Sequence, residues 1–137
     1  MIIDASVAFK LVVEEPGSEE AIAWAARSEL VAPTLIHSEI GNALWKRVQR
    51  REIVGGGAVG ERLADMARYI RTVDETPLMP RALQLAIELG HPIYDCVYLA
   101  LAEAQEDELL TADARFLKSV QGTGHQQRVR ELGAWEQ

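Results

Sequence analysis

The sequence predicts an α/β protein whose central, mainly parallel sheet is covered by helices on both faces. Short apolar segments of strand length alternate along the chain with longer segments of helical period. The connections between successive strands are long enough to cross over the sheet, as parallel pairing requires. A chain of 137 residues can bury a substantial core, and we expect one domain over residues 1–137.

Strands are predicted where short apolar runs end at a turn or polar residue. The first covers residues 1–4, and the second is LVAP at residues 30–33. A less regular strand is expected within residues 71–78, a compact one within DELLTAD at 107–113, and a weak one within QQRVREL at 126–132. Each is separated from the next by at least one predicted helix.

Helices are predicted from apolar residues that recur every three or four positions. The longest follows Thr34, its expected N-cap, and carries Ile36 and Ile40 on one stripe. Pro80 starts another helix and Gly90 ends it. The predicted helices cover residues 6–13, 18–27, 34–51, 60–70, 80–89, 92–104 and 114–120.

The composition excludes several classes of protein. Hydrophobic residues make up 48% and charged residues 26% of the chain, as in ordinary globular domains. The single cysteine, Cys96, has no partner for an intrachain disulfide, lies in an apolar run and indicates a reducing compartment. The start MIIDAS lacks the features of a signal peptide, and no apolar run reaches membrane-spanning length. We therefore expect a cytoplasmic protein that does not contact membranes.

Four acidic residues are distinguished from the other acids of the chain by apolar surroundings. The chain has 21 Asp and Glu residues, most of them in polar runs. Asp4 and Asp113 each end a predicted strand, Glu39 lies in an apolar helix turn, and Asp95 begins the apolar helix PIYDCVYLALAEA. Ligands of open parallel sheets bind outside the carboxyl ends of the strands. If the strands before Asp4 and Asp113 are neighbours, all four carboxylates meet in one cleft.

Such a gathering of carboxylates requires a cation. Two like charges about 5 Å apart repel by roughly 3 kcal/mol at an effective dielectric constant of about 20. Ligands that are all oxygen suit Mg²⁺ or Mn²⁺ better than Zn²⁺ or Cu²⁺. His37, His91 and His125 show no metal-binding spacing and are expected to be surface or hydrogen-bonded histidines.

Taken singly, each acid also has a structural explanation. Asp95 suits the N-terminus of its helix as a cap, and Asp113 suits the helix that begins at Ala114. The spacing of Glu39 and Lys46 is wrong for a direct ion pair on a helix. The repeated placement of acids at apolar strand ends and helix turns favours a shared site over four separate structural roles.

The segments around these acids resemble the PIN-domain family, and more closely the VapC-type ribonuclease toxins of bacterial toxin–antitoxin pairs. The matching motifs are IIDASV with Asp4 and Ser6, SEIGNALWK with Glu39 and Asn42, YDCVYLALAE with Asp95, and LLTADARF with Thr111 and Asp113. Their order and approximate spacing agree over nearly the whole chain, and no acidic position is replaced. The glycine-rich segment 55–60 and the C-terminal tail contribute little to the resemblance.

The resemblance implies a PIN-like three-layer α/β/α sandwich and a metal-dependent endoribonuclease. The catalytic and metal-binding residues would be Asp4, Glu39, Asp95 and Asp113, with Mg²⁺ or Mn²⁺ as the cofactor. Metal-activated water would hydrolyse RNA phosphodiester bonds and leave a 5′-phosphate and a 3′-hydroxyl. Ser6, Asn42 and Thr111 would orient the carboxylates through hydrogen bonds.

The resemblance also implies macromolecular partners. These are a second copy of the chain in a homodimer and a cognate VapB-type antitoxin, which wraps the toxin and places a basic side chain near the acids. DNA would be contacted only indirectly, through the antitoxin. We predict exposed apolar surface for these interfaces around Trp24, Trp45 and Trp135, with core packing as the alternative.

The net charge of −7 argues against general attraction to nucleic acid, so RNA binding needs local positive charge. Lys46 and Arg50 recur on the Glu39 side of their helix, and Arg115 and Lys118 follow Asp113. We predict that these four residues bind RNA phosphates. An ordinary solvated basic face is the alternative. Bound divalent cations would add to the positive potential.

Two other functions are compatible with parts of the sequence. GGGAVG at residues 55–60 fits the dinucleotide-binding pattern G-x-G-x-x-G, but only Ile53 and Val54 separate it from a long helix, where the pattern needs a strand. A helix–helix connection is the preferred interpretation. A non-catalytic PIN-like module that binds RNA or protein is the second alternative, and the complete set of four acids argues against it.

Overall fold

Five parallel strands form the centre of the computed structural model, which describes residues 1–133. Their order across the sheet is β3-β2-β1-β4-β5, and every neighbouring pair is parallel. The strands are β1 (Ile2–Ile3), β2 (Leu30–Pro33), β3 (Ile70–Val73), β4 (Leu109–Thr111) and β5 (Val129–Glu131). The three central strands are wholly buried, which is why they read as continuous apolar runs.

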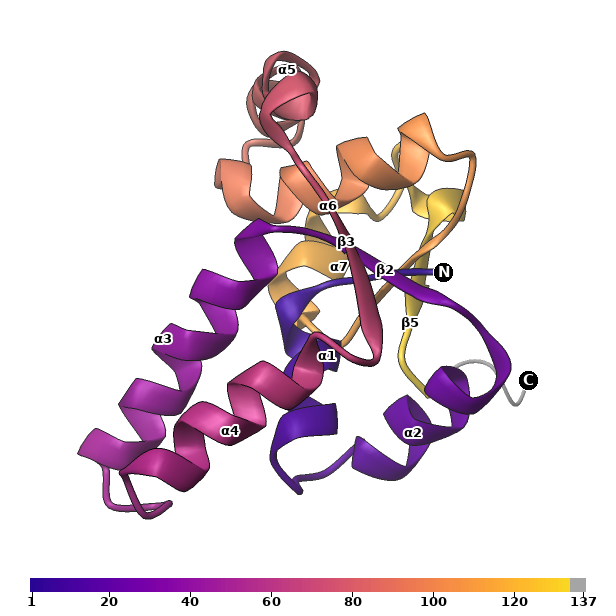
Figure 1. Cartoon of the computed structure of the whole chain (residues 1–137). Coiled ribbons are helices and arrows are strands. Elements are labelled where there is room, and N and C mark those ends of the chain that lie inside the picture. Colours follow the sequence, from indigo (N-terminus) through magenta and orange to yellow (C-terminus); the bar gives the residue numbers. More distant parts are fainter. Residues whose placement is uncertain (134–137) are drawn as a thin grey trace.

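Helices connect these strands and form the two outer layers. They are α1 (Ala5–Val12), α2 (Ser18–Arg27), α3 (Leu35–Gln49), α4 (Gly57–Met66), α5 (Met79–Leu89), α6 (Ile93–Ala104) and α7 (Ala114–Val120). Right-handed crossovers put α1 to α4 on one face and α5 to α7 on the other. Figure 1 shows α2 and α4 below the sheet and α5 and α6 above it. The predicted fold class, an α/β/α sandwich with a parallel sheet, is confirmed.

Helix α6 is the most deeply buried helix in the part of the chain described. Its residues Cys96 to Ala102 are all buried, and it packs against β1, β2 and β4. Burial and the charge of Asp95 raise the pKa of the Cys96 thiol to about 11. The thiol therefore stays protonated at neutral pH and fills space in the core, as expected. No helix within residues 1–133 has both the length and the apolar character needed to span a bilayer.

Several predicted boundaries differ from the structure. Helix α4 begins at Gly57, inside the glycine cluster, and ends at Met66, so that Ile70 belongs to β3 instead of the preceding helix. Thr34 directly precedes α3, but its backbone is already helical and its hydroxyl donates to Glu75. Thr34 therefore occupies the predicted N-cap position, but its side chain makes no capping hydrogen bond to the free N–H groups of α3.

The segment before the glycine cluster is a helix and a loop. Helix α3 ends at Gln49, and residues 50–56 contain turns and bends but no strand. A dinucleotide-binding fingerprint requires a strand at this place, so this context argues against that alternative.

The two tryptophans that can be checked divide between the two alternatives, core packing and exposed apolar surface. Trp24 is only 9% exposed and packs in the core, so the core-packing alternative holds for it. Trp45 is 57% exposed on α3. Trp135 lies outside the described residues.

Gly90 and Gly60 provide a matched test of local backbone conformation. Gly90 ends α5 with a left-handed φ of 60°, whereas Gly60 lies within helix α4, and a Cβ at either position meets nothing within 4 Å. Gly90→Ala is expected to lower the free energy of unfolding by about 1 kcal/mol, and Gly60→Ala to raise it by about 0.5–1 kcal/mol. Urea unfolding in EDTA measures both, and equal effects would contradict these backbone assignments.

Candidate metal and active site

Asp4 and Asp113 lie at the carboxyl ends of neighbouring parallel strands. Strand β1 pairs with β4, and the Asp4 N–H donates to the Leu110 carbonyl at 3.3 Å. Asp4 is the N-cap of α1, and Asp113 is the N-cap of α7. The strands that precede Asp4 and Asp113 are therefore neighbours, as a shared site for the four acids requires.

Three donors hold the buried carboxylate of Asp4. The Ser6 hydroxyl donates to Oδ1 at 2.5 Å, the Val7 N–H donates to the same oxygen at 3.2 Å, and the Thr111 hydroxyl donates to Oδ2. Ser6 and Thr111 are themselves fixed, because their oxygens accept from the N–H groups of Ala112 and Asp113. The local structure therefore fixes the orientation of this carboxylate.

Burial dominates the acidity of Asp4. The pKa of this carboxyl is raised to about 7, mainly by burial; the charge of Asp95 adds to the increase, and the hydrogen bonds from Ser6, Thr111 and Val7 oppose it. An acid with this pKa is partly protonated near neutral pH unless a cation stabilises its ionised form.

Glu39 and Asp95 come from helices and each contacts one other polar side chain. Glu39 lies in the second turn of α3 and accepts from the Tyr98 hydroxyl at 2.5 Å. Asp95 lies in the first turn of α6, with its Oδ2 at 2.5 Å from His91 Nε2. Burial raises the pKa of both carboxyls, and these two hydrogen bonds oppose the increase.

Asp95 is electrostatically coupled to the other three acids. Its charge raises the pKa of Asp4 and of Glu39, and the charge of Asp113 raises the pKa of Asp95. The structure thus brings all four predicted acids into one electrostatically coupled region at the carboxyl end of the sheet. Among residues 1–133, no group of three or more His, Cys, Asp or Glu side chains is arranged so that it could hold a metal ion.

The four acids nevertheless offer the type of donor atom that a hard cation prefers. Within the described part of the chain, Glu39 Oε2, Asp95 Oδ1 and Asp113 Oδ2 accept no hydrogen bond, so one oxygen of each carboxylate is available. Carboxylate oxygens are the ligands that Mg²⁺ and Mn²⁺ prefer. Mg²⁺ keeps several waters when bound, which suits an open group of carboxylates.

The capping explanation holds for Asp113 and fails for Asp95. Asp113 Oδ1 accepts from the N–H groups of Arg115 at 2.9 Å and Phe116 at 3.3 Å. The N-cap of α6 is Pro92, and Asp95 makes its hydrogen bond to His91 instead of to the backbone. Helix capping therefore does not account for an acid at position 95.

Sequence reasoning did not identify two residues of this site, Tyr98 and His91. Helical spacing, three residues after Asp95, is the signal that could have placed Tyr98 beside it, whereas His91 lies before the helix and has no such signal. Tyr98 was hidden because it lies inside an apolar run and is fully buried. His91 was assigned only as a surface or hydrogen-bonded histidine, yet its side chain is 10% exposed and contacts Asp95.

The predicted polar and basic residues outside the four acids and their hydroxyl donors lie on the surface of the protein. Asn42 is exposed on α3, and its side chain makes no hydrogen bond to another residue in the range 1–133. Lys46, Arg50, Arg115 and Lys118 are all exposed. Among these four, the charge of Arg115 acts on an acid of the site, because it lowers the pKa of Asp95.

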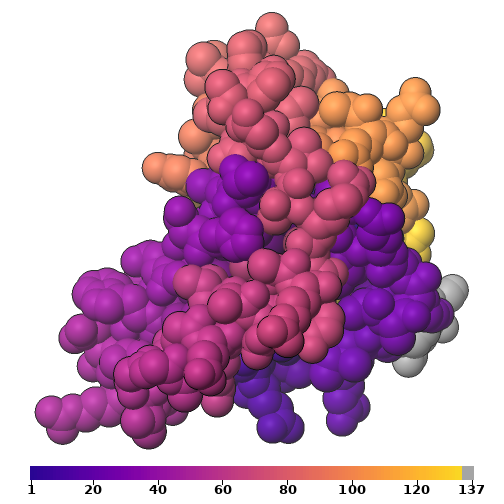
Figure 2. Space-filling model, viewed as in Figure 1, coloured from indigo at the N-terminus to yellow at the C-terminus, as the bar shows by residue number. Residues whose placement is uncertain are grey.

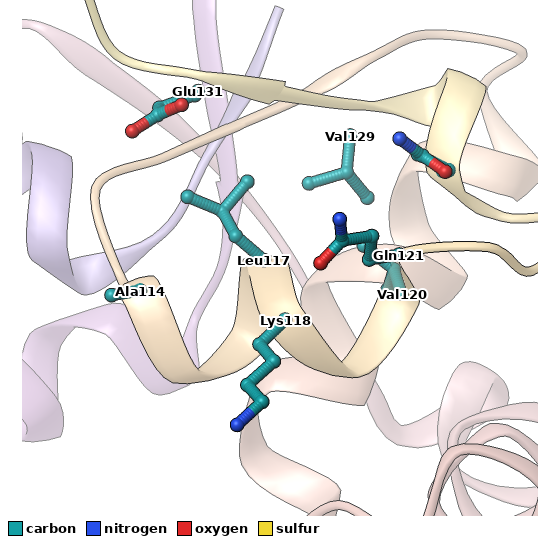
Figure 3. Close-up of a pocket in the computed structure, with 8 residues that line it drawn as sticks. Ala114, Leu117, Lys118, Val120, Gln121, Val129 and Glu131 are labelled. Carbon is teal, nitrogen blue, oxygen red and sulfur yellow. The ribbon is translucent and has the colours of Figure 1, made fainter.

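Lys118 borders a cavity of about 560 Å³ between α7 and β5. In Figure 3 its ammonium group extends away from Val129 and Glu131, which line the same cavity. None of the four predicted acids lines this cavity, so it is separate from the carboxylate region.

Comparison with known proteins relates the chain to several ribonucleases by sequence. Ribonuclease VapC3 from Pyrobaculum aerophilum is 32% identical over 117 residues, which cover 82% of this chain and 88% of that protein. Ribonuclease VapC9 from Mycobacterium tuberculosis is 32% identical over 118 residues, covering 84% and 87% respectively.

Solved structures and a family model agree with these relationships. A crystal structure of a Pyrobaculum aerophilum protein has a TM-score of 0.70 and 26% identity, covering 96% of this chain and 82% of that one. A toxin–antitoxin complex from Klebsiella pneumoniae contains a chain with the same fold, with a TM-score of 0.67, 15% identity and 94% coverage of both chains. The family model described as PIN domain matches residues 1–120. The chain therefore belongs to the PIN domain family, as its four motifs indicated.

Proposed function

We propose that this chain is a Mg²⁺- or Mn²⁺-dependent endoribonuclease and the toxin of a VapBC-type toxin–antitoxin pair. The observation that carries the proposal is the electrostatic coupling of Asp95 to Asp4, Glu39 and Asp113 at the carboxyl end of the sheet. The names of the relatives, ribonucleases VapC3 and VapC9, support the same activity.

In this mechanism the four acids hold the cation and order the groups around it. Asp4 contributes a carboxylate fixed by Ser6 and Thr111, and Glu39 and Asp95 each contribute their available oxygen. A cation held there would lower the pKa of coordinated water and neutralise charge on the scissile phosphate. A carboxylate oxygen that accepts no other hydrogen bond can orient the attacking water and accept its proton.

RNA is held by exposed basic residues in this proposal. Arg115 lies near Asp95 and is the basic residue best placed to contact a phosphate beside the acids. Lys46, Arg50 and Lys118 are assigned to phosphates farther along the RNA strand. Their contacts provide affinity without reading the base sequence.

The proposed partners are a cognate antitoxin and a second copy of the chain. We place the chain and both interactions in the cytoplasm. Leu83 and Ile87 are exposed on α5 and offer apolar area to a second copy. A groove of about 260 Å³ between α3 and α4, lined in part by Trp45, offers a separate apolar surface to the antitoxin. Figure 2 shows α5 and the α3–α4 arm projecting from the body in different directions.

Removal of the metal tests the proposed activity. Purified protein is expected to cleave RNA with Mg²⁺ or Mn²⁺, and EDTA should reduce cleavage to background because the acids alone do not activate water. Sequencing of the RNA ends should show 5′-phosphates and 3′-hydroxyls. Cleavage that survives EDTA would contradict the proposal, and binding without cleavage would support the non-catalytic alternative.

A further inference from the structure

Three polar side chains lie on one side of the N-terminal part of α6. Asp95 and Tyr98 are one turn apart on the helix, and His91 lies two residues before the helix begins. The spacing of three residues puts Asp95 and Tyr98 on the same face of the helix, and the hydrogen bond between His91 and Asp95 places His91 on that side. Tyr98 and His91 are thus the immediate neighbours of the acid that couples to all the others.

The Tyr98 hydroxyl reaches across from α6 to α3. It donates to Glu39 Oε1 at 2.5 Å, and the Tyr98 side chain is fully buried in the core. An ionised carboxylate only accepts hydrogen bonds, so the phenol must be the donor. Burial and the charge of Glu39 raise the pKa of Tyr98, which keeps its proton in place.

The imidazole of His91 makes the equivalent contact to Asp95. Its Nε2 lies 2.5 Å from Asp95 Oδ2. The ring packs edge-on against Phe116, with 5.3 Å between the ring centroids, and only 10% of the side chain is exposed. Core packing therefore holds His91, as it holds Tyr98, so neither side chain moves easily to another partner.

Each contact occupies one oxygen of a carboxylate and leaves the other available. Within residues 1–133, Glu39 Oε2 and Asp95 Oδ1 accept no hydrogen bond. We propose that Tyr98 and His91 are positioning residues that fix the carboxylates of Glu39 and Asp95 with their second oxygens directed to the cation. This inference rests on the proposed function, because it assumes that the acids bind a metal.

A merely structural role makes a different prediction. If Tyr98 and His91 served only to satisfy buried polar atoms, their removal would lower the stability of the metal-free protein and leave the metal affinity unchanged. Hydrogen-bonding partners of metal ligands change affinity by about 10- to 100-fold when removed. Metal affinity and apo stability must therefore be measured separately on the same variants.

Isothermal titration of the full chain with Mn²⁺ measures the affinity. Tyr98→Phe is expected to weaken the Kd for Mn²⁺ by about 10- to 100-fold. Tyr94→Phe is the matched control, since Tyr94 lies on the same helix but is 59% exposed, and its Kd should stay within about twofold of the wild type. Urea unfolding in EDTA reports whether each variant is folded.

Variants of His91 provide an independent arm. Gln places a donor near the position of Nε2, whereas Leu removes it. His91→Gln should keep the Mn²⁺ affinity within a few fold, and His91→Leu should lose about as much as Tyr98→Phe. If Tyr98→Phe does not fold, the two His91 variants decide the matter alone.

The possible results separate this inference from the proposed function. A wild-type protein that binds no Mn²⁺ removes the basis of both. Suppose instead that the wild type binds Mn²⁺ and that the Tyr98→Phe and His91→Leu variants fold and bind it with unchanged affinity. That result overturns the positioning roles and leaves the nuclease proposal standing. Weaker binding in both variants and normal binding in the Tyr94→Phe control supports the inference.

Discussion

Asp95→Asn is expected to lower the rate of RNA cleavage by at least about 100-fold in Mg²⁺ or Mn²⁺, equivalent to about 3 kcal/mol of transition-state stabilisation. Asp95 is the acid whose charge is coupled to Asp4, Glu39 and Asp113. Asn has almost the same shape and keeps an acceptor for His91, so the change removes charge and leaves the packing intact. Single-turnover cleavage of RNA by equal amounts of folded protein measures the effect.

Asp65→Asn is the matched control for this loss of charge. Asp65 is exposed on α4 and forms a surface pair with Arg68, so its replacement should change the cleavage rate by less than about twofold. A folded Asp95→Asn variant that retains most of the wild-type rate would contradict the catalytic role of the acids.

The metal-free protein is expected to lose stability as the pH rises from about 4 to about 7. Asp4 has a folded-state pKa of about 7, raised from 3.8. Below both values the folded and unfolded states are equally protonated at this site. Between these two pKa values Asp4 is ionised in the unfolded state and still protonated in the folded state. The free energy of unfolding therefore falls as the pH rises, and this loss is nearly complete at pH 7. The decrease in the free energy of unfolding due to Asp4 is on the order of 4 kcal/mol.

Asp4→Asn isolates this contribution from the other acids. Asn cannot ionise, and its oxygen can still accept from Val7 and Ser6, while its amide can donate to Thr111. In EDTA at about pH 8 the variant should be about 2–3 kcal/mol more stable than the wild type, and at about pH 4 it should show no gain. Urea unfolding at both pH values gives the difference.

Two results of that experiment bear on the cation site. Added Mn²⁺ should stabilise the wild type at about pH 8 and have much less effect on Asp4→Asn, because the cation offsets the cost of ionised buried carboxylates. An Asp4→Asn variant that is less stable than the wild type at every pH would show that the hydrogen bonds of Asp4, and not its buried charge, dominate its effect on stability.

The sheet and its helices were predictable because their sequence patterns are local. Buried parallel strands read as short apolar runs, and α2 and β2 fall on the predicted residues. The start of α4 was not predictable from propensity, since Gly57 and Gly60 are poor helix formers that the tertiary structure keeps helical. Thr34 is the N-cap residue of α3 as predicted, but its hydroxyl donates to Glu75, 41 positions away, instead of capping the helix, and the sequence gives no signal of that contact.

The candidate site was predictable in its acids and less so in their hydrogen-bonding partners. Asp4, Asp95 and Asp113 are conspicuous as charges at the ends of apolar runs. Tyr98 carries no such signal, because a tyrosine inside an apolar helix is indistinguishable from core until the position of Glu39 is known. Contacts between residues 59 positions apart are set by the order of the strands and helices in space, which local patterns do not contain.

Anomalous diffraction from crystals grown with Mn²⁺ tests most directly whether the four acids form a cation site. The account predicts a Mn²⁺ peak bound by oxygens of Asp4, Glu39, Asp95 and Asp113, at the carboxyl ends of β1 and β4, and no such peak in Asp95→Asn crystals. Wild-type crystals with no peak among these carboxylates, or with Mn²⁺ bound only elsewhere, would contradict it.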